Sequence, residues 1–150
     1  MKFKYFVSSL LLMAVMACNQ SAKESVNSKV SATGNQEQKR DGVYFVNLKD
    51  GDNVKSPFII EMGVKGMEVE PAGKLNEGKG HHHLIIDGSF TEKGQMVAKD
   101  ETHLHFGKGQ TSDTLSLSPG THTLTLQFAN GLHQSYGQDW SNTISVTVEN

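Results

Sequence analysis

From about residue 41 onward, apolar and polar residues alternate with a period of two. This is the spacing of a β-strand, whose side chains point to opposite faces in turn. The clearest case is 121–128, in which Leu124, Leu126 and Phe128 fall on one face. No convincing helical pattern occurs in this part of the chain. The alternation predicts about seven strands, within 43–48, 57–64, 82–87, 103–106, 114–117, 121–128 and 143–148.

Turn signals separate these predicted strands. Asp50-Gly51-Asp52, Pro119-Gly120 and Asn130-Gly131 are residue combinations that favour tight turns. Short strands joined by turns predict an all-β fold, a single antiparallel β-sandwich of immunoglobulin-like type. The predicted domain, residues 41–150, has a length that suits one hydrophobic core.

The N-terminal 40 residues have a different composition. Lys2 and Lys4 precede an apolar run that is too short to span a bilayer, so residues 1–17 are predicted to be a signal peptide. The run ends in 15–18, Val-Met-Ala-Cys, which resembles the lipobox of bacterial lipoproteins. The resemblance implies cleavage before Cys18 and lipid attachment to its sulfur. An ordinary secretory peptide with an incidental cysteine is the alternative.

Residues 18–40 are predicted to be a lipidated cysteine followed by a disordered tether, because this polar stretch cannot bury enough apolar surface to offset chain entropy. Stable anchoring needs two or more acyl chains. We therefore expect a protein of the bacterial cell envelope, anchored to a membrane through Cys18 on the periplasmic side or at the cell surface. Cys18 is the only cysteine, which excludes an intramolecular disulfide.

Charge and motifs narrow the classes of function. The formal net charge is −2, with one tryptophan and no basic patch, which argues against nucleic-acid binding. The chain contains no Gly-x-Ser-x-Gly, no His-Glu-x-x-His and no phosphate-binding loop. A binding module is therefore favoured over an enzyme.

Histidines carry the candidate chemistry. Five of the seven lie in two short strand-like runs, 81–83 and 103–105. Alternation places His81 and His83 on one face of the first strand, and His103 and His105 on one face of the second. Two imidazoles at i and i+2 lie about 6–7 Å apart at Cβ, close enough to reach one ion. The pattern predicts a transition-metal site, with copper or zinc as the metal, because neutral imidazole is a common ligand for both.

The other candidates have weaker arguments. His82 shares its face with Leu84, which favours a structural role, although it could also be a further ligand or support the ligands. His122 lies at a strand end and His133 follows a turn, so each could be a further ligand or a hydrogen-bonded or solvated side chain. Asp87 could be a carboxylate that orients an imidazole.

Several of these elements resemble a known bacterial domain family of unknown function, number 4399 in its naming scheme. They are residues 66–67, 71–73, 80–87, 103–111 and 117–124, which occur together and in order. The family is found in exported bacterial proteins and has no established activity. The resemblance implies that the histidines are family features: His81, His82, His83, His103, His105, His122 and His133. Many relatives carry more histidines after the position of His122, where this chain has only His133.

Together these features predict a lipid-anchored envelope protein that binds copper or zinc. We expect His81 or His83 to meet His103 or His105 on one side of the sheet, with the loop 66–80 as a wall. Three alternatives remain at this level: a copper-type metalloenzyme, a metal-delivery protein, and a ligand-binding or interaction module in which the histidines only brace loops.

Overall fold

The computed structural model describes residues 41–150, so the predicted signal peptide (1–17), Cys18 and the tether (18–40) lie outside the described residues. The described chain is all-β, with one short 3-10 turn, η1. Its strands are β1 (Gly42–Phe45), β2 (Asp52–Lys55), β3 (Phe58–Lys65), β4 (Glu68–Val69), β5 (Lys79–Ile86), β6 (His103–His105), β7 (Ser112–Leu115), β8 (Gly120–Ala129) and β9 (Ser141–Glu149), with η1 at Gln138–Trp140. Within residues 41–150, no helix has the length and apolar character needed to cross a membrane.

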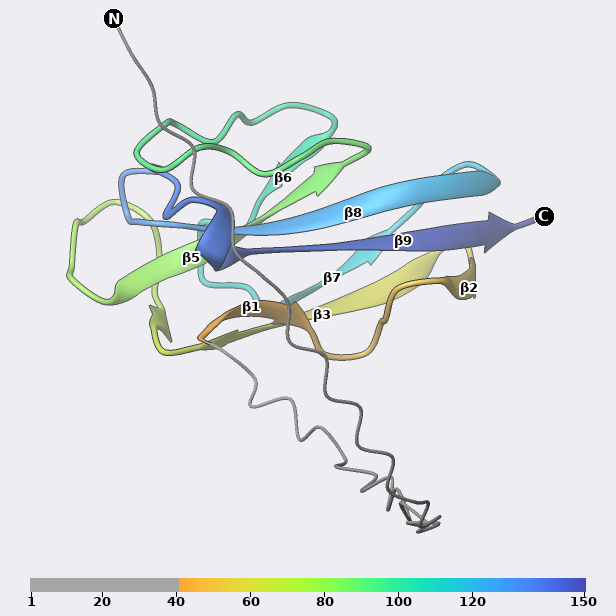
Figure 1. Cartoon of the computed structure of the whole chain (residues 1–150), viewed down its shortest axis with the longest axis horizontal. Helices are drawn as coiled ribbons and strands as arrows, with labels where there is room; N and C mark the ends of the chain where they lie inside the picture. The colour runs from red at the N-terminus through yellow and green to blue at the C-terminus, as the bar shows by residue number, and fades with distance from the viewer. Residues whose placement is uncertain (1–40) are drawn as a thin grey trace, which may run out of the picture. The chain divides into compact units, whose positions relative to one another are not determined.

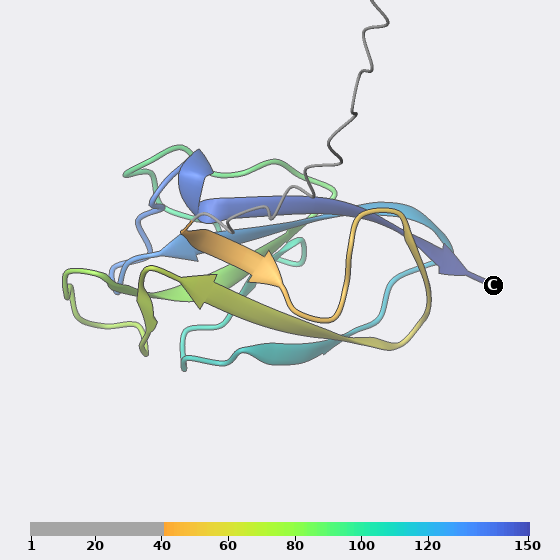
Figure 2. The same ribbon diagram turned by 60° about the horizontal axis from the view of Figure 1, so that its bottom comes forward.

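The strands form two sheets packed face to face, as Figures 1 and 2 show. One sheet has the order β1-β3-β7, and the other has the order β2-β9-β8-β5-β4, with β6 paired to β5. In the immunoglobulin plan, strands A, B and E share one sheet and strands C, F and G share the other. Strands β1, β3 and β7 match the first set, and β5, β8 and β9 match the second. The prediction of a β-sandwich is therefore confirmed.

The structure adds two short strands to the pattern of about seven that the sequence predicts. The sequence pattern missed β2 and β4 because these short strands are largely exposed and show no long alternation. Strand β2 pairs with β9 and strand β4 with β5, and both pairs are parallel. These pairs extend the larger sheet beyond the antiparallel ladder.

The main core lies between the two sheets. Ile60 and Met62 of β3 face Leu84 of β5 and Leu126 and Phe128 of β8, and all five are at most 2% exposed. Leu84 thus points inward, as its parity predicts. Residues at alternate positions of β5 must then point to the outer face of the larger sheet.

That outer face is also buried. Ile85 of β5 and Gln127 of β8 are at most 1% exposed although they point away from the sandwich core. The segment 88–102 and the loop 130–137 are fastened over them. The Thr91 amide donates to Gln127 Oε1 at 3.1 Å, and the Ser135 hydroxyl donates to the Thr91 carbonyl at 2.7 Å. This second buried layer contains the histidines of β5.

Candidate metal centre

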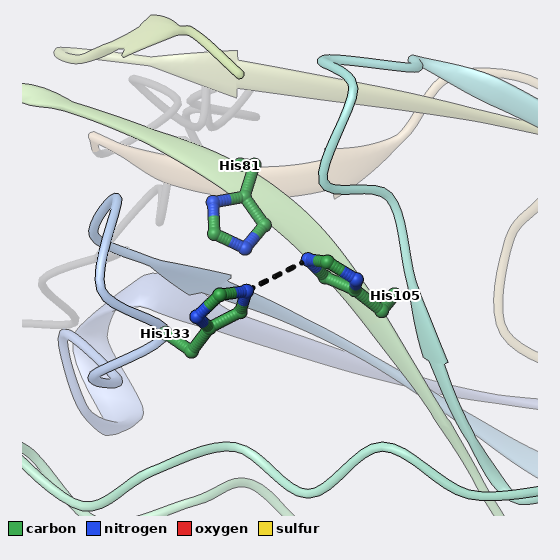
Figure 3. Close-up of side chains that lie close together, drawn as sticks. All are labelled: His81, His105 and His133. Carbon is green, nitrogen blue, oxygen red and sulfur yellow. Dashed lines mark hydrogen bonds between the residues drawn. The ribbon is translucent and has the colours of Figure 1, made fainter. Parts of the chain in front are cut away.

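Three segments that are distant in sequence bring four histidines together. His81 and His83 lie two residues apart on the outer face of β5, and each is 0% exposed. His105 on the edge strand β6 stands directly opposite His83 in the ladder. His133 reaches the same place from the loop after β8, and Figure 3 shows His81, His105 and His133 pointing toward one another. Two of the four imidazoles therefore come from the inner strand β5, one from the edge strand β6 and one from a loop.

The ring nitrogens converge. Nε2 of His83 lies 3.1 Å from Nε2 of His81, and Nε2 of His133 lies 3.0 Å from Nε2 of His105. The ring centroids of His81 and His105 are 5.0 Å apart, as are those of His81 and His133. One nitrogen from each of His81, His105 and His133 lies within 4.8 Å of the other two. We call His81, His83, His105 and His133 the histidine cluster.

These separations match the dimensions of a metal site. Zinc binds imidazole nitrogen at about 2.0–2.1 Å with tetrahedral geometry, which places neighbouring nitrogens roughly 3.3–3.4 Å apart. The Nε2 pairs are within a few tenths of an ångström of that spacing. They are also at hydrogen-bond distance, so two neutral rings in complementary tautomers could make the same contacts.

Electrostatics keep the cluster in the form that binds metals. Burial, reinforced by repulsion from His105, His133 and His82, lowers the pKa of His81 to about 4. Burial and then the neighbouring imidazoles, His81 first, lower the pKa of His83 to about 2. Burial and His133 also lower the pKa of His105. The imidazoles of His81, His83 and His105 are therefore neutral at pH 7, and neutral imidazole carries the free lone pair that ligates metals.

His103 is on the same strand as His105 but has another partner. Its Nδ1 is 2.8 Å from Asp100 Oδ1 and 3.1 Å from the Thr102 hydroxyl. It pairs with Ile85 in the ladder, two residues along β6 from His105. The structure thus brings His105, and not His103, into the group of converging nitrogens.

His122 and Asp87 form a separate contact. His122 Nδ1 is 2.8 Å from Asp87 Oδ2, and its Nε2 is 3.0 Å from the Ser118 carbonyl oxygen. Both ring nitrogens therefore have partners. His122 is seven residues along β8 from Ala129, the partner of His81, which corresponds to about 23 Å. Asp87 orients this histidine and not a ring of the cluster.

His82 points into the sandwich core, as predicted. Its ring meets Phe128 edge-on at 5.1 Å between centroids, and it is 0% exposed. Neither of its ring nitrogens has a hydrogen-bond partner among the described residues, and burial lowers its pKa to about 4. Nδ1 of His81 and Nδ1 of His83 are likewise buried without a partner.

Parity within the strands could not place His133, because a loop side chain has no face that periodicity defines. The available signal was the Asn130-Gly131 turn, which predicts that the chain folds back after β8. The loop 66–80, predicted to form a wall of the site, makes hydrogen bonds to backbone two residues from His105 and two residues from His133. The Ala72 amide donates to the Gly107 carbonyl at 2.9 Å, and the Gly73 amide donates to the Gly131 carbonyl at 2.8 Å.

The fold and the site define an all-β sandwich in which two buried imidazoles of one sheet, His81 and His83, meet two half-buried ones, His105 and His133. The chain belongs to the family described as "Domain of unknown function (DUF4399)", whose model matches residues 60–149. The whole histidine cluster lies in the matched range. The match confirms the resemblance of residues 66–124 to this family.

Other comparisons add little. No curated protein matches the chain. Among solved structures, the chain is similar to the X-ray structure of the endo-beta-1,4-mannanase from Thermotoga petrophila, with 15% identity and a TM-score of 0.44. The match covers 77% of this chain and 21% of that chain. The likeness is too distant to bear on function.

Proposed function

We propose that this protein binds a transition metal, zinc or copper(II), through His81, His83, His105 and His133. The observation that carries the proposal is the convergence of ring nitrogens from His81, His105 and His133 within 4.8 Å of one another. His83 Nε2, at 3.1 Å from that of His81, supplies a fourth nitrogen. Residues on two strands and one loop would not bring their imidazoles together through ordinary packing of apolar side chains.

The donor set supports the choice of metal. The converging group contains histidines and no carboxylate, whereas calcium and magnesium take oxygen ligands. Imidazole suits zinc and copper, and a tetrahedral set of nitrogens suits zinc in particular. Copper(II) and nickel also accept imidazole, but both favour planar or tetragonal arrangements, so zinc fits a tetrahedral set best.

Four nitrogen ligands favour binding over catalysis. A catalytic zinc keeps three protein ligands and one open position for water. If His83 completes the set, no tetrahedral position is left open, and the site holds its metal without activating water. The predicted export signal and Cys18 support a location in the bacterial cell envelope, with the domain tethered to a membrane. The proposed role is thus that of a lipid-anchored metal-binding module.

One alternative rests on the same distances. If the Nε2 pairs are hydrogen bonds between neutral rings, the histidines only brace the loops over β5. The two proposals differ in what a metal does to stability. A ligand present at 100 times its Kd stabilises the folded state by about 2.7 kcal/mol, whereas a metal has no such effect on a purely structural network.

The test is metal analysis and titration of protein made without a polyhistidine tag. We expect one zinc or copper(II) per chain and a raised melting temperature that chelator reverses. His105→Ala and His133→Ala should weaken binding by more than the 10–100-fold typical of lost outer-shell partners. His122→Ala and His103→Ala are the matched controls, because their rings lie outside the cluster, and should keep the wild-type affinity. Binding that survives loss of both His105 and His133 would refute the site.

A further inference from the structure

The loop that carries His133 has an unusual residue at its most constrained position. His133 has φ of +67°, in the left-handed region. The Asn130 carbonyl accepts the His133 amide at 2.9 Å, and the Asn130 amide donates to the Gln134 carbonyl at 2.9 Å. This closes a three-residue hairpin loop in which a type I turn is followed by a left-handed residue. Glycine ordinarily occupies that last position.

Histidine at this position has a conformational cost. A left-handed backbone brings a Cβ too close to the following carbonyl oxygen, so it is unfavourable for every residue except glycine. The chain places glycine at 131 instead, two residues before the position that would benefit most from it. The left-handed backbone is also what turns the His133 ring toward β6, where its Nε2 lies 3.0 Å from that of His105. The unfavourable backbone conformation of His133 therefore occurs together with the contact between its ring and His105.

The Asn130 side chain is built to hold this conformation. Its Oδ1 accepts the Leu132 amide at 2.9 Å and the Gln134 amide at 3.0 Å, so it bonds the residues on both sides of His133. Its Nδ2 donates to the Gln134 side chain at 3.1 Å. Asn130 is 8% exposed and follows directly after the last residue of β8. It thus links a rigid strand to the backbone that flanks a cluster histidine.

We propose that Asn130 is the positioning residue of the histidine cluster, fixing His133 in its left-handed conformation so that the imidazole meets His105. The expected effect on metal affinity rests on the proposed function. The effect on the conformation of His133 does not, because it is measured in metal-free protein. Outer-shell residues that orient a metal-binding histidine typically contribute 10–100-fold to affinity. Asn130 holds the backbone on both sides of His133, whereas most outer-shell residues accept a hydrogen bond from the second ring nitrogen of the histidine.

The experiment compares wild type with Asn130→Ala, Asn130→Asp and Asn47→Ala. Asn47 is the matched control, because its side chain also bridges backbone groups, Ile59 O and Glu61 N at 2.9 Å each, but on the other sheet. In metal-free protein, NMR should show the strong amide-to-α contact of a positive φ at His133, and ring contacts between His133 and His105. Asn130→Ala should lose both, while Asn130→Asp, which keeps the acceptor, and Asn47→Ala should retain both.

Zinc titration supplies the second readout. Asn130→Ala should raise the Kd by 10–100-fold, and adding Asn130→Ala to His133→Ala should raise it no further, since both changes remove the same ring. His133→Gly should weaken binding while raising the urea midpoint of unfolding, because glycine relaxes the left-handed position. Asn130→Ser replaces Asn130→Ala if the latter fails to fold.

The outcomes separate the two proposals. If wild type binds neither zinc nor copper(II) but Asn130→Ala loses the His133 conformation, the proposed function fails and the positioning role holds. If Asn130→Ala keeps the NMR contacts, or if its effect adds fully to that of His133→Ala, the positioning role is overturned.

Discussion

At the scale of single residues, His82 differs from His81 and His83 in the direction of its side chain. The strand alternation sends it into the core against Phe128, while His81 and His83 enter the histidine cluster. Both His82 ring nitrogens are buried without a partner in the described structure. An unsatisfied buried polar group costs about 1–3 kcal/mol, so this side chain weakens the fold that it helps to fill.

We expect His82→Leu, similar in volume, to raise the free energy of unfolding by about 1–3 kcal/mol, because it removes that desolvation cost. Metal affinity should not change, since the ring faces away from the cluster. Urea denaturation and metal titration check the two parts. A loss of stability or of metal binding would show that His82 has a partner or a role in the site.

At the scale of the strand, β5 has a buried layer on each side. Its inward face packs in the hydrophobic core between the two sheets. Leu84 is 0% exposed and packs in the main core, so Leu84→Ala should cost about 2–5 kcal/mol. The control is Ile59→Ala on β3, where the side chain is 57% exposed and a change within about 0.5 kcal/mol is expected. Equal effects in denaturant titrations of the two variants would contradict the assignment of faces.

The same alternation explains what could be predicted from sequence. It identified seven of the nine strands within residues 41–150 and the inward direction of Leu84 and His82, because long antiparallel strands with one covered face show a clear period. It could not show that the outer face of β5 is covered as well, because segment 88–102 has no periodic signal. It also treated His103 and His105 alike, since parity cannot show that Asp100 lies within reach of one ring.

At the scale of the whole molecule, the histidines make stability depend on pH. Burial lowers the pKa of His81 and of His82 to about 4 and that of His83 to about 2, each below the unfolded value near 6.5. Below pH 6.5 the unfolded chain therefore binds more protons than the folded chain, and stability falls as the pH falls. Above that value His81, His82 and His83 are neutral in both states, and their contribution to stability is constant.

We therefore expect the metal-free protein to lose stability progressively from about pH 6.5 to pH 4, as measured by urea denaturation at a series of pH values. The variant with His81 and His83 both replaced by Gln should show a smaller slope. A slope that is the same in this variant and in wild type would mean that these imidazoles are not buried as described.

The predicted lipid anchor at Cys18 concerns where the whole molecule is located. If Cys18 carries the lipid, Cys18→Ser should move the protein from the membrane fraction to the soluble fraction of its native host without changing the fold of residues 41–150. Fractionation and mass spectrometry of the mature N-terminus provide the measurement. A wild-type protein that is soluble and unacylated would contradict the lipoprotein prediction and leave the histidine cluster unaffected.

The most direct test of the central claim is X-ray absorption spectroscopy of the zinc-loaded, untagged protein. The account predicts a first shell of four nitrogen atoms at about 2.0–2.1 Å, with the outer-shell scattering of imidazole rings. His133→Ala should reduce the imidazole count by one. A first shell of oxygen atoms, or a spectrum that is unchanged in His133→Ala, would contradict the claim that the histidine cluster is a metal site.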